Sequence, residues 1–169
     1  MSVLAKDRKE QPFRCQQQAE AITGLLIDDV LEKFAMPLHY EQWDAQKGAY
    51  IVSEKLYPRY AVRFVRDRLM EKSAELLDAI AIGNSINPST VPGAVRNAEI
   101  AERRIWQSRA IGYATAIQAQ CNLLVSRFPS QMHRFKHYTT ELDALIATLR
   151  KWKKYIPPAR KNGDVPAGS

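Results

Sequence analysis

The chain has 169 residues, of which 46% are hydrophobic and 25% are charged, and its formal net charge at pH 7 is +7. These proportions exclude an intrinsically disordered chain, and no apolar run approaches the roughly 20 residues that a membrane-spanning helix needs. Residues 1–13 are too polar for a signal peptide, so we expect a cytoplasmic protein in which Cys15 and Cys121 are reduced.

The basic residues are concentrated in the last two thirds of the chain. Residues 1–58 carry 7 basic and 9 acidic groups, residues 59–127 carry 10 and 6, and residues 128–169 carry 8 and 3. Concentrated Lys and Arg attract polyanions, of which nucleic acids are the most common. Net charge alone is equally compatible with a solvated surface that serves solubility.

Residues 17–155 are expected to form a single helical domain, with a disordered or loose N-terminus over residues 1–16 and a flexible basic tail over residues 156–169. The first helix should run from about Gln17 to Met36, because apolar residues recur on one side of it. It should end at Pro37, since proline disfavours helical geometry in the residue before it.

Two helices are expected next, on either side of Pro58. The first covers residues 40–56, where no alternation typical of a strand and no hairpin turn is evident. The second covers about residues 59–82 and carries three arginines at steps of 4 and 3: Arg59, Arg63 and Arg66. These steps place three guanidinium groups on one face, for which a solvated surface is an equally good interpretation.

A loop over residues 83–93 precedes a long helix that should extend to about Phe128. Apolar and small residues lie on two sides of this helix, so we expect it to contact neighbours on both sides. Trp106 and Tyr113 mark one of these sides. Trp106 is also flanked by three arginines: Arg103, Arg104 and Arg109.

The last helix, from about Ser130 to Tyr155, has the clearest pattern. Apolar residues recur at steps of 4, 3, 4 and 3, the spacing of a bundle contact: Tyr138, Leu142, Leu145, Leu149 and Trp152. The helix ends in four cations: Arg150, Lys151, Lys153 and Lys154. We assign six residues to packing in the core or between subunits: Trp106, Tyr113, Leu142, Leu145, Leu149 and Trp152. The predicted fold class is all-α, an up-and-down four-helix bundle with an additional N-terminal helix.

No combination of residues predicts catalysis, a cofactor or a metal site. His133 and His137 have the i,i+4 spacing of two metal ligands, but they lack the context of an HExxH motif and a third ligand nearby in sequence. The glycines do not have the spacing of a phosphate-binding loop, and no nucleophile motif is present. We therefore interpret the protein as non-enzymatic.

Clustered cations interleaved with aromatic residues favour nucleic-acid binding through phosphate contacts. No helix-turn-helix or zinc finger is evident, which argues against sequence-specific recognition of DNA. We expect ten residues from three helices to converge into one electropositive surface: Arg59, Arg63, Arg66, Arg103, Arg104, Arg109, Arg150, Lys151, Lys153 and Lys154.

The order of features from Tyr57 to Tyr155 resembles the accessory variability determinants, small helical accessory proteins of diversity-generating retroelements. These proteins belong to a wider group of four-helix-bundle proteins that includes the ribosomal-RNA intervening-sequence proteins. The matching segments are the entry Tyr57-Pro58, the helix RFVRDRLMEKSAELLDAI, its close at Gly83-Asn84, the segment AERRIWQSRA, and the terminal residues Leu142, Asp143, Leu149 and Trp152.

The resemblance implies a homo-oligomer, a pentamer in that family, with a basic outer surface and no catalytic residues. It implies binding to a reverse transcriptase and its template RNA, in support of error-prone copying. The alternative hypothesis is a structural or protein-interaction bundle whose basic surface binds an acidic protein partner.

Overall fold

The structure, a computed structural model, describes residues 3–88, 93–156 and 158, with side chains described from Arg14 onward. The described residues form four helices and one two-stranded sheet, in the order α1 (Val3–Lys33), β1 (His39–Asp44), β2 (Ala49–Leu56), α2 (Arg59–Ser85), α3 (Gly93–Arg127) and α4 (Phe135–Lys154).

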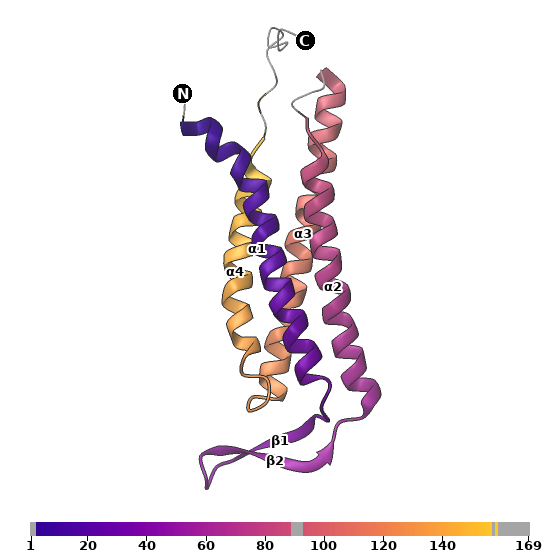
Figure 1. The fold of residues 1–169 in the computed structure, drawn as a ribbon, viewed down its shortest axis with the longest axis vertical. Helices are drawn as coiled ribbons and strands as arrows, with labels where there is room; N and C mark the ends of the chain where they lie inside the picture. Colours follow the sequence, from indigo (N-terminus) through magenta and orange to yellow (C-terminus); the bar gives the residue numbers. More distant parts are fainter. Residues whose placement is uncertain (1–2, 89–92, 157, 159–169) are drawn as a thin grey trace.

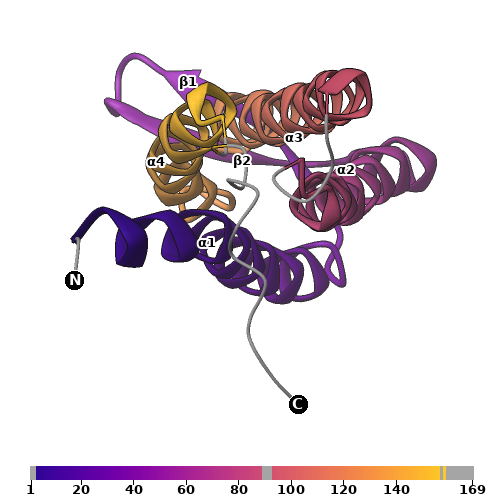
Figure 2. The same cartoon turned by 90° about the horizontal axis from the view of Figure 1, so that it is seen from above.

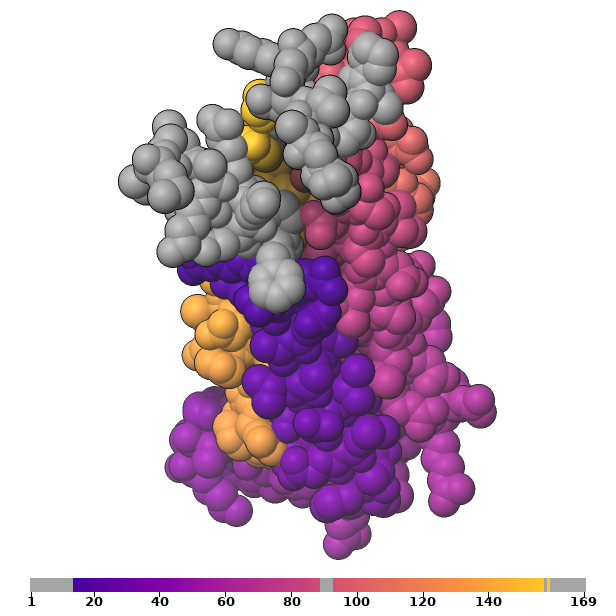
Figure 3. All heavy atoms as spheres, turned by 45° about the horizontal axis from the view of Figure 1, so that its top comes forward, coloured from indigo at the N-terminus to yellow at the C-terminus, as the bar shows by residue number. Residues whose placement is uncertain are grey.

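The four helices lie side by side, and successive helices run in opposite directions (Figure 1). α1 packs against α2 and α4, and α3 packs against the same two helices from the opposite side (Figure 2). The space-filling view likewise shows α1 between α4 and α2 (Figure 3). The buried apolar residues form one core between the helices, which is where amphipathic helices bury their apolar faces.

The helix expected over residues 40–56 is wrong, because this segment is an antiparallel β-hairpin in which Trp43 pairs with Tyr50. Asp44 Oδ1 accepts hydrogen bonds from the backbone N–H groups of the following turn, and Gly48 adopts a φ of 60°. A positive φ is easy only for glycine, and β-branched and aromatic residues favour strands over helices. The turn and the strand residues together therefore outweigh the weak helical pattern.

The remaining differences concern the ends of helices. α1 begins at Val3 rather than near Gln17, so the chain is helical through most of the segment expected to be loose. That segment is polar, but Lys, Arg, Glu and Gln are good helix formers, so polarity did not indicate a loop. The tail expected over residues 156–169 lies almost entirely outside the described residues.

The expectation of a mainly helical chain is confirmed. The part of the chain that the structure describes holds no helix besides these four, so α1 is a member of the group rather than an addition to it. None of the described helices is long and apolar enough to cross a membrane.

Candidate nucleic-acid interface

The ends of α3 and α4 that lie far from the hairpin bring cations from two helices together. Near mid-helix, Gln118 Nε2 of α3 donates a hydrogen bond to Asp143 Oδ1 of α4 at 2.7 Å, which identifies the flanks where these helices meet. Arg104 lies about four turns before Gln118, and Arg150 and Lys154 lie about two and three turns after Asp143. Whole turns return a side chain to the same flank, so the three cations share one surface, which we call the basic end.

The cations of the basic end have no acidic partner in the part of the chain that the structure describes. Arg104, Arg150 and Lys154 are exposed and form no ion pair with any residue that the structure describes. Lys151 is also exposed and Lys153 is half-buried in the last turn of α4. Unpaired cations from two helices keep their full charge for a polyanion.

The other two arginines of α3 that were predicted to bind nucleic acid pack against tryptophans. The exposed Arg109 places its guanidinium carbon 4.4 Å from the centre of the Trp106 ring. Arg103 is buried, with 7% of its surface exposed, and its guanidinium carbon lies 5.7 Å from the centre of the Trp152 ring. Burial lowers the pKa of Arg103 from its ordinary value. An arginine nevertheless stays charged in a protein at neutral pH, so a positive charge is held inside this end.

The three arginines predicted on α2 lie away from the basic end, so the ten predicted residues do not gather on one surface. Gly83, near the end of α2, packs against Trp152, and at 1.5 Å per residue the three arginines lie roughly 25–36 Å back along the helix. Two of them are also paired with the Asp67 carboxylate, which accepts hydrogen bonds from Arg66 Nη2 at 2.8 Å and from Arg63 Nε at 3.3 Å. Arg59 is exposed beside the hairpin.

The residues assigned to packing lie mostly inside this single chain. The buried ones are Leu142, Leu145, Leu149 and Trp152. Trp106 and Tyr113 are half-buried on the flank of α3 that faces α2, where Lys72 Nζ lies 5.3 Å from the centre of the Tyr113 ring. Packing within the chain therefore accounts for this stripe without a second subunit.

The opposite end of the molecule has the reverse chemistry. We define the hairpin end as β1, β2 and the first two turns of α2. It exposes seven large apolar or aromatic side chains: Trp43, Tyr50, Ile51, Val52, Leu56, Tyr60 and Phe64. Trp43 is 53% exposed and Tyr60 is 78% exposed. Exposed apolar residues gathered in this way mark protein-interaction surfaces.

A cavity of about 420 Å³ opens where the hairpin meets the helices. Its wall is almost wholly apolar and includes Phe34, Leu38, Tyr40, Tyr57, Val62 and Phe128. The rings of Tyr40 and Tyr57 stack with their centres 3.7 Å apart. A cavity of this size and lining is typical of sites that take an apolar group from a ligand or partner.

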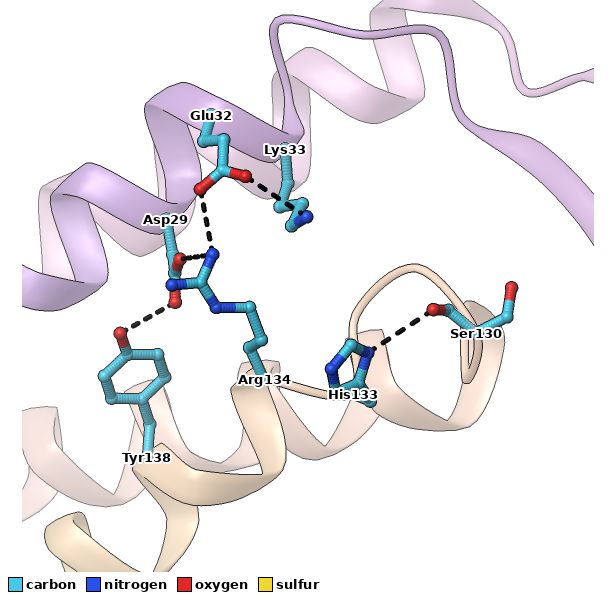
Figure 4. Close-up of polar contacts among 7 residues, drawn as sticks. All are labelled: Asp29, Glu32, Lys33, Ser130, His133, Arg134 and Tyr138. Atoms are coloured by element: carbon cyan, nitrogen blue, oxygen red, sulfur yellow. Dashed lines mark hydrogen bonds and ion pairs between the residues drawn. The ribbon is translucent and has the colours of Figure 1, made fainter.

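Polar contacts fasten α1 to the start of α4 near the hairpin (Figure 4). Asp29 is 4% exposed. Its Oδ1 lies 3.0 Å from Arg134 Nη1, and its Oδ2 accepts a hydrogen bond from the Tyr138 hydroxyl at 2.8 Å. Arg134 also donates to Glu32 Oε2 at 2.9 Å. In the sequence, the acidic Asp29 beside Val30 in an apolar stripe is the one sign of this network, and it did not lead to a prediction.

The network shifts two pKa values. Hydrogen bonding and charge from Lys33, assisted by Arg134, lower the pKa of Glu32. Burial and the hydrogen bond to Asp29 raise the pKa of Tyr138. Tyr138 therefore stays neutral and Asp29 has a charged partner, which describes a structural clamp rather than a proton-transfer site.

Little of the described structure offers catalytic chemistry. Cys15 and Cys121 are free and buried, and burial raises their pKa values to about 11 and about 12, so both thiols stay protonated at neutral pH. Among the described residues, no three His, Cys, Asp or Glu side chains stand close enough together to hold a metal ion. His137 approaches only Glu141, at 3.9 Å.

Comparison with protein-family models, curated proteins and solved structures found no match. Fold alone rarely determines function, so the chemistry of the two ends has to carry the argument.

Proposed function

We propose that this protein is a non-enzymatic accessory protein that binds nucleic acid, RNA or an RNA/DNA hybrid, together with a reverse transcriptase. In this role it supports template-directed, mutagenic reverse transcription in a diversity-generating retroelement. The sequence resemblance supplies the retroelement and the polymerase. The nucleic-acid part is supported by one observation above all: Arg104 of α3 and Arg150 and Lys154 of α4 lie on one surface and form no ion pair with any described residue.

The arrangement of positive charge at the basic end suits the phosphates of a nucleic acid. Arg104, Arg150 and Lys154 are exposed, come from two helices, and have no carboxylate partner among the described residues. Such a surface binds phosphates without reading bases, through release of the counterions that surround a nucleic acid. Binding should therefore be tight at low salt, weak at high salt and nearly independent of sequence.

The hairpin end is the better candidate for protein contacts. Its exposed aromatic residues, such as Trp43 and Tyr60, are of the kind that anchor protein–protein interfaces. We assign the contacts with the reverse transcriptase and with further copies of the chain to this end, with five copies by analogy to the family. The same feature favours the second candidate function, a protein-interaction bundle whose basic end binds an acidic protein.

A binding titration with matched variants tests the nucleic-acid proposal. The probe is a fluorescent single-stranded RNA of 20 nucleotides, and fluorescence anisotropy is measured at several salt concentrations. One variant reverses the charge of three cations at the basic end (Arg104→Glu, Arg150→Glu, Lys154→Glu). The control makes the same change in net charge on α2 (Arg59→Glu, Arg63→Glu, Arg66→Glu).

We expect the basic-end variant to lose most of its affinity and its log–log salt slope to fall by about 2, or about 0.7 for each lost single-strand contact. The α2 variant should keep most of both. Equal losses in the two variants would instead mean that total charge governs binding. An acidic protein partner with no RNA binding at low salt would favour the second candidate function.

A further inference from the structure

The buried face of α3 changes character near the basic end. In its later turns this face is made of small or apolar residues, among them Ala110 and Ala114. In its first turns the same face continues through Arg96, Glu99, Arg103 and Gln107, at steps of 3, 4 and 4. Steps of three and four keep side chains on one side of a helix. The interior at this end is therefore lined by polar and charged groups.

Two buried hydrogen-bond donors meet there without acceptors. Arg103 Nε and Trp152 Nε1 are both buried and neither has a hydrogen-bond partner. Arg103 also forms no ion pair with any described residue, although its guanidinium carbon lies 5.7 Å from the centre of the Trp152 ring. A buried donor without an acceptor is unfavourable, and a buried charge without a counter-charge more so.

No described residue forms an ion pair with Arg103. Gln107 Nε2 donates to the Trp152 carbonyl at 3.1 Å, so this donor is satisfied within the chain. Glu99 lies about one turn before Arg103 on this face, and its Oε2 is buried without a hydrogen-bond partner, but it forms no ion pair with Arg103. The Arg103 guanidinium is therefore without a counter-charge among the described residues, and an anion with several acceptor oxygens would supply one.

We propose that Arg103 and Trp152 form a binding site for a phosphate-class oxyanion, held by the guanidinium and the indole N–H. A guanidinium offers paired donors that match the oxygens of a phosphate, and an indole N–H donates only. The proposal deepens the proposed function and rests on it for the source of the anion, which is a backbone phosphate of the bound nucleic acid. The exposed cations of the basic end then hold the flanking phosphates.

Thermal unfolding of the full-length protein tests the site with inorganic phosphate as the probe. The wild type is compared in chloride and in phosphate at equal ionic strength, beside Arg103→Met. In chloride we expect Arg103→Met to unfold at the same or a higher temperature than the wild type, because it removes an uncompensated buried charge. Phosphate should then raise the unfolding temperature of the wild type by several degrees, in a saturable way, and leave the variant unchanged.

Three further variants separate the site from general charge. Lys151→Met removes an exposed cation from the same end and should keep the phosphate response. Trp152→Phe removes the indole N–H but keeps a ring, and should weaken the response. Glu99→Gln removes the competing carboxylate and should strengthen it. An Arg103→Met protein that is equally destabilised in both buffers would make Arg103 a packing residue and overturn the proposal.

RNA binding then identifies the source of the anion. A loss of about tenfold in RNA affinity for Arg103→Met at fixed salt, with intact phosphate response in Lys151→Met, supports a backbone phosphate. A lost phosphate response with unchanged RNA affinity keeps the oxyanion site but assigns it to free phosphate, against the nucleic-acid source. If the basic-end triple variant loses RNA binding and Arg103→Met alters neither measurement, the site is refuted and the proposed function stands.

Discussion

Two arginines that lie beside opposite ends of α4, Arg134 just before it and Arg103 of α3, differ in how their charge is balanced. Arg134, at the start of the helix, is half-exposed and reaches two carboxylates, Asp29 at 3.0 Å and Glu32 at 2.9 Å. Arg103 faces the end of the helix, is almost fully buried and has no carboxylate within ion-pair distance among the described residues. The chain completes its polar contacts beside the hairpin and leaves them incomplete at the basic end.

Apolar contacts show the opposite distribution. Trp152 at the basic end is 1% exposed and packs against Gly83, whereas Trp43 on the hairpin is more than half exposed and contacts Tyr50 edge to face. In the described part of the chain, the two ends therefore differ in what they leave without a partner: charge at the basic end and apolar surface at the hairpin end. Among the described residues, the cations of the basic end form no ion pair, whereas the hairpin end exposes apolar side chains, so the two ends suit partners of different chemistry.

The largest predicted difference between the two ends is in the free energy of unfolding when Trp152 or Trp43 is replaced by alanine. We expect Trp152→Ala to lower the free energy of unfolding by about 3–5 kcal/mol, because it empties a closely packed site in the core. Trp43→Ala should cost less than about 1 kcal/mol, since water already reaches its ring. Chemical denaturation monitored by circular dichroism measures both values.

The outcome of that pair also bears on the hairpin end. If Trp43→Ala destabilised the isolated chain as much as Trp152→Ala, the hairpin would be part of the core. The proposed protein-interaction surface would then lose its main support. A hairpin that serves a partner predicts instead a nearly normal stability and a weakened association with that partner.

A smaller effect should come from Arg134→Met. Among the described residues, this change leaves the buried Asp29 carboxylate with the Tyr138 hydroxyl as its one partner, and we expect a loss of about 2–3 kcal/mol in the free energy of unfolding. The value lies below that for breaking a fully buried pair because Arg134 is half-exposed to water. In chloride, Arg103→Met should not lower the free energy of unfolding. The two Arg→Met substitutions should therefore change this free energy by different amounts or in opposite directions.

The pH dependence provides a control for that comparison. The pKa of Glu32 is lowered by Lys33 and Arg134 in the folded protein, so its contribution is present above the ordinary pKa of about 4.5 and disappears as the pH falls. The cost of Arg134→Met should therefore shrink in acid. A cost that stays constant from pH 7 to pH 3 would assign the effect to the lost arginine stem rather than to charge.

The sequence was sufficient for the helices because their signals are local. The apolar spacing of α4 from Tyr138 to Trp152 directly predicts its buried face, and Pro37 and Pro58 mark the chain breaks around the hairpin. The pairing of Trp43 with Tyr50 was missed because both strands are short and largely exposed, and neither shows alternating burial.

The basic end was harder to predict because the spacing of residues along one helix does not show which helices lie next to each other in the fold. Three cation clusters stand out in the sequence, yet only the order and direction of the helices decide that Arg104 lies near Arg150 and that Arg63 does not. Burial of Arg103 was equally hidden, since an arginine beside a tryptophan is usually exposed. Neutralisation by Asp67 could have been expected, because it lies four residues after Arg63.

The smallest expected effect concerns this pairing and would test how strictly binding is confined to the basic end. Asp67→Asn frees Arg63 and Arg66, and should change the free energy of unfolding by less than about 1 kcal/mol because the ion pairs are exposed. The matched control is Glu102→Gln, which removes an exposed carboxylate beside Arg103 and Arg104.

Both substitutions raise the net charge by one, so they differ only in where the charge appears. At low salt we expect Glu102→Gln to raise RNA affinity roughly two- to fivefold, because repulsion near the bound phosphates is relieved within a Debye length of about 10 Å. Asp67→Asn should leave the affinity within about twofold, since its charge appears roughly 24 Å away along α2, more than two Debye lengths, and is largely screened. An equal gain for Asp67→Asn would mean that the nucleic acid also runs along α2, and that the two ends of the molecule share one ligand.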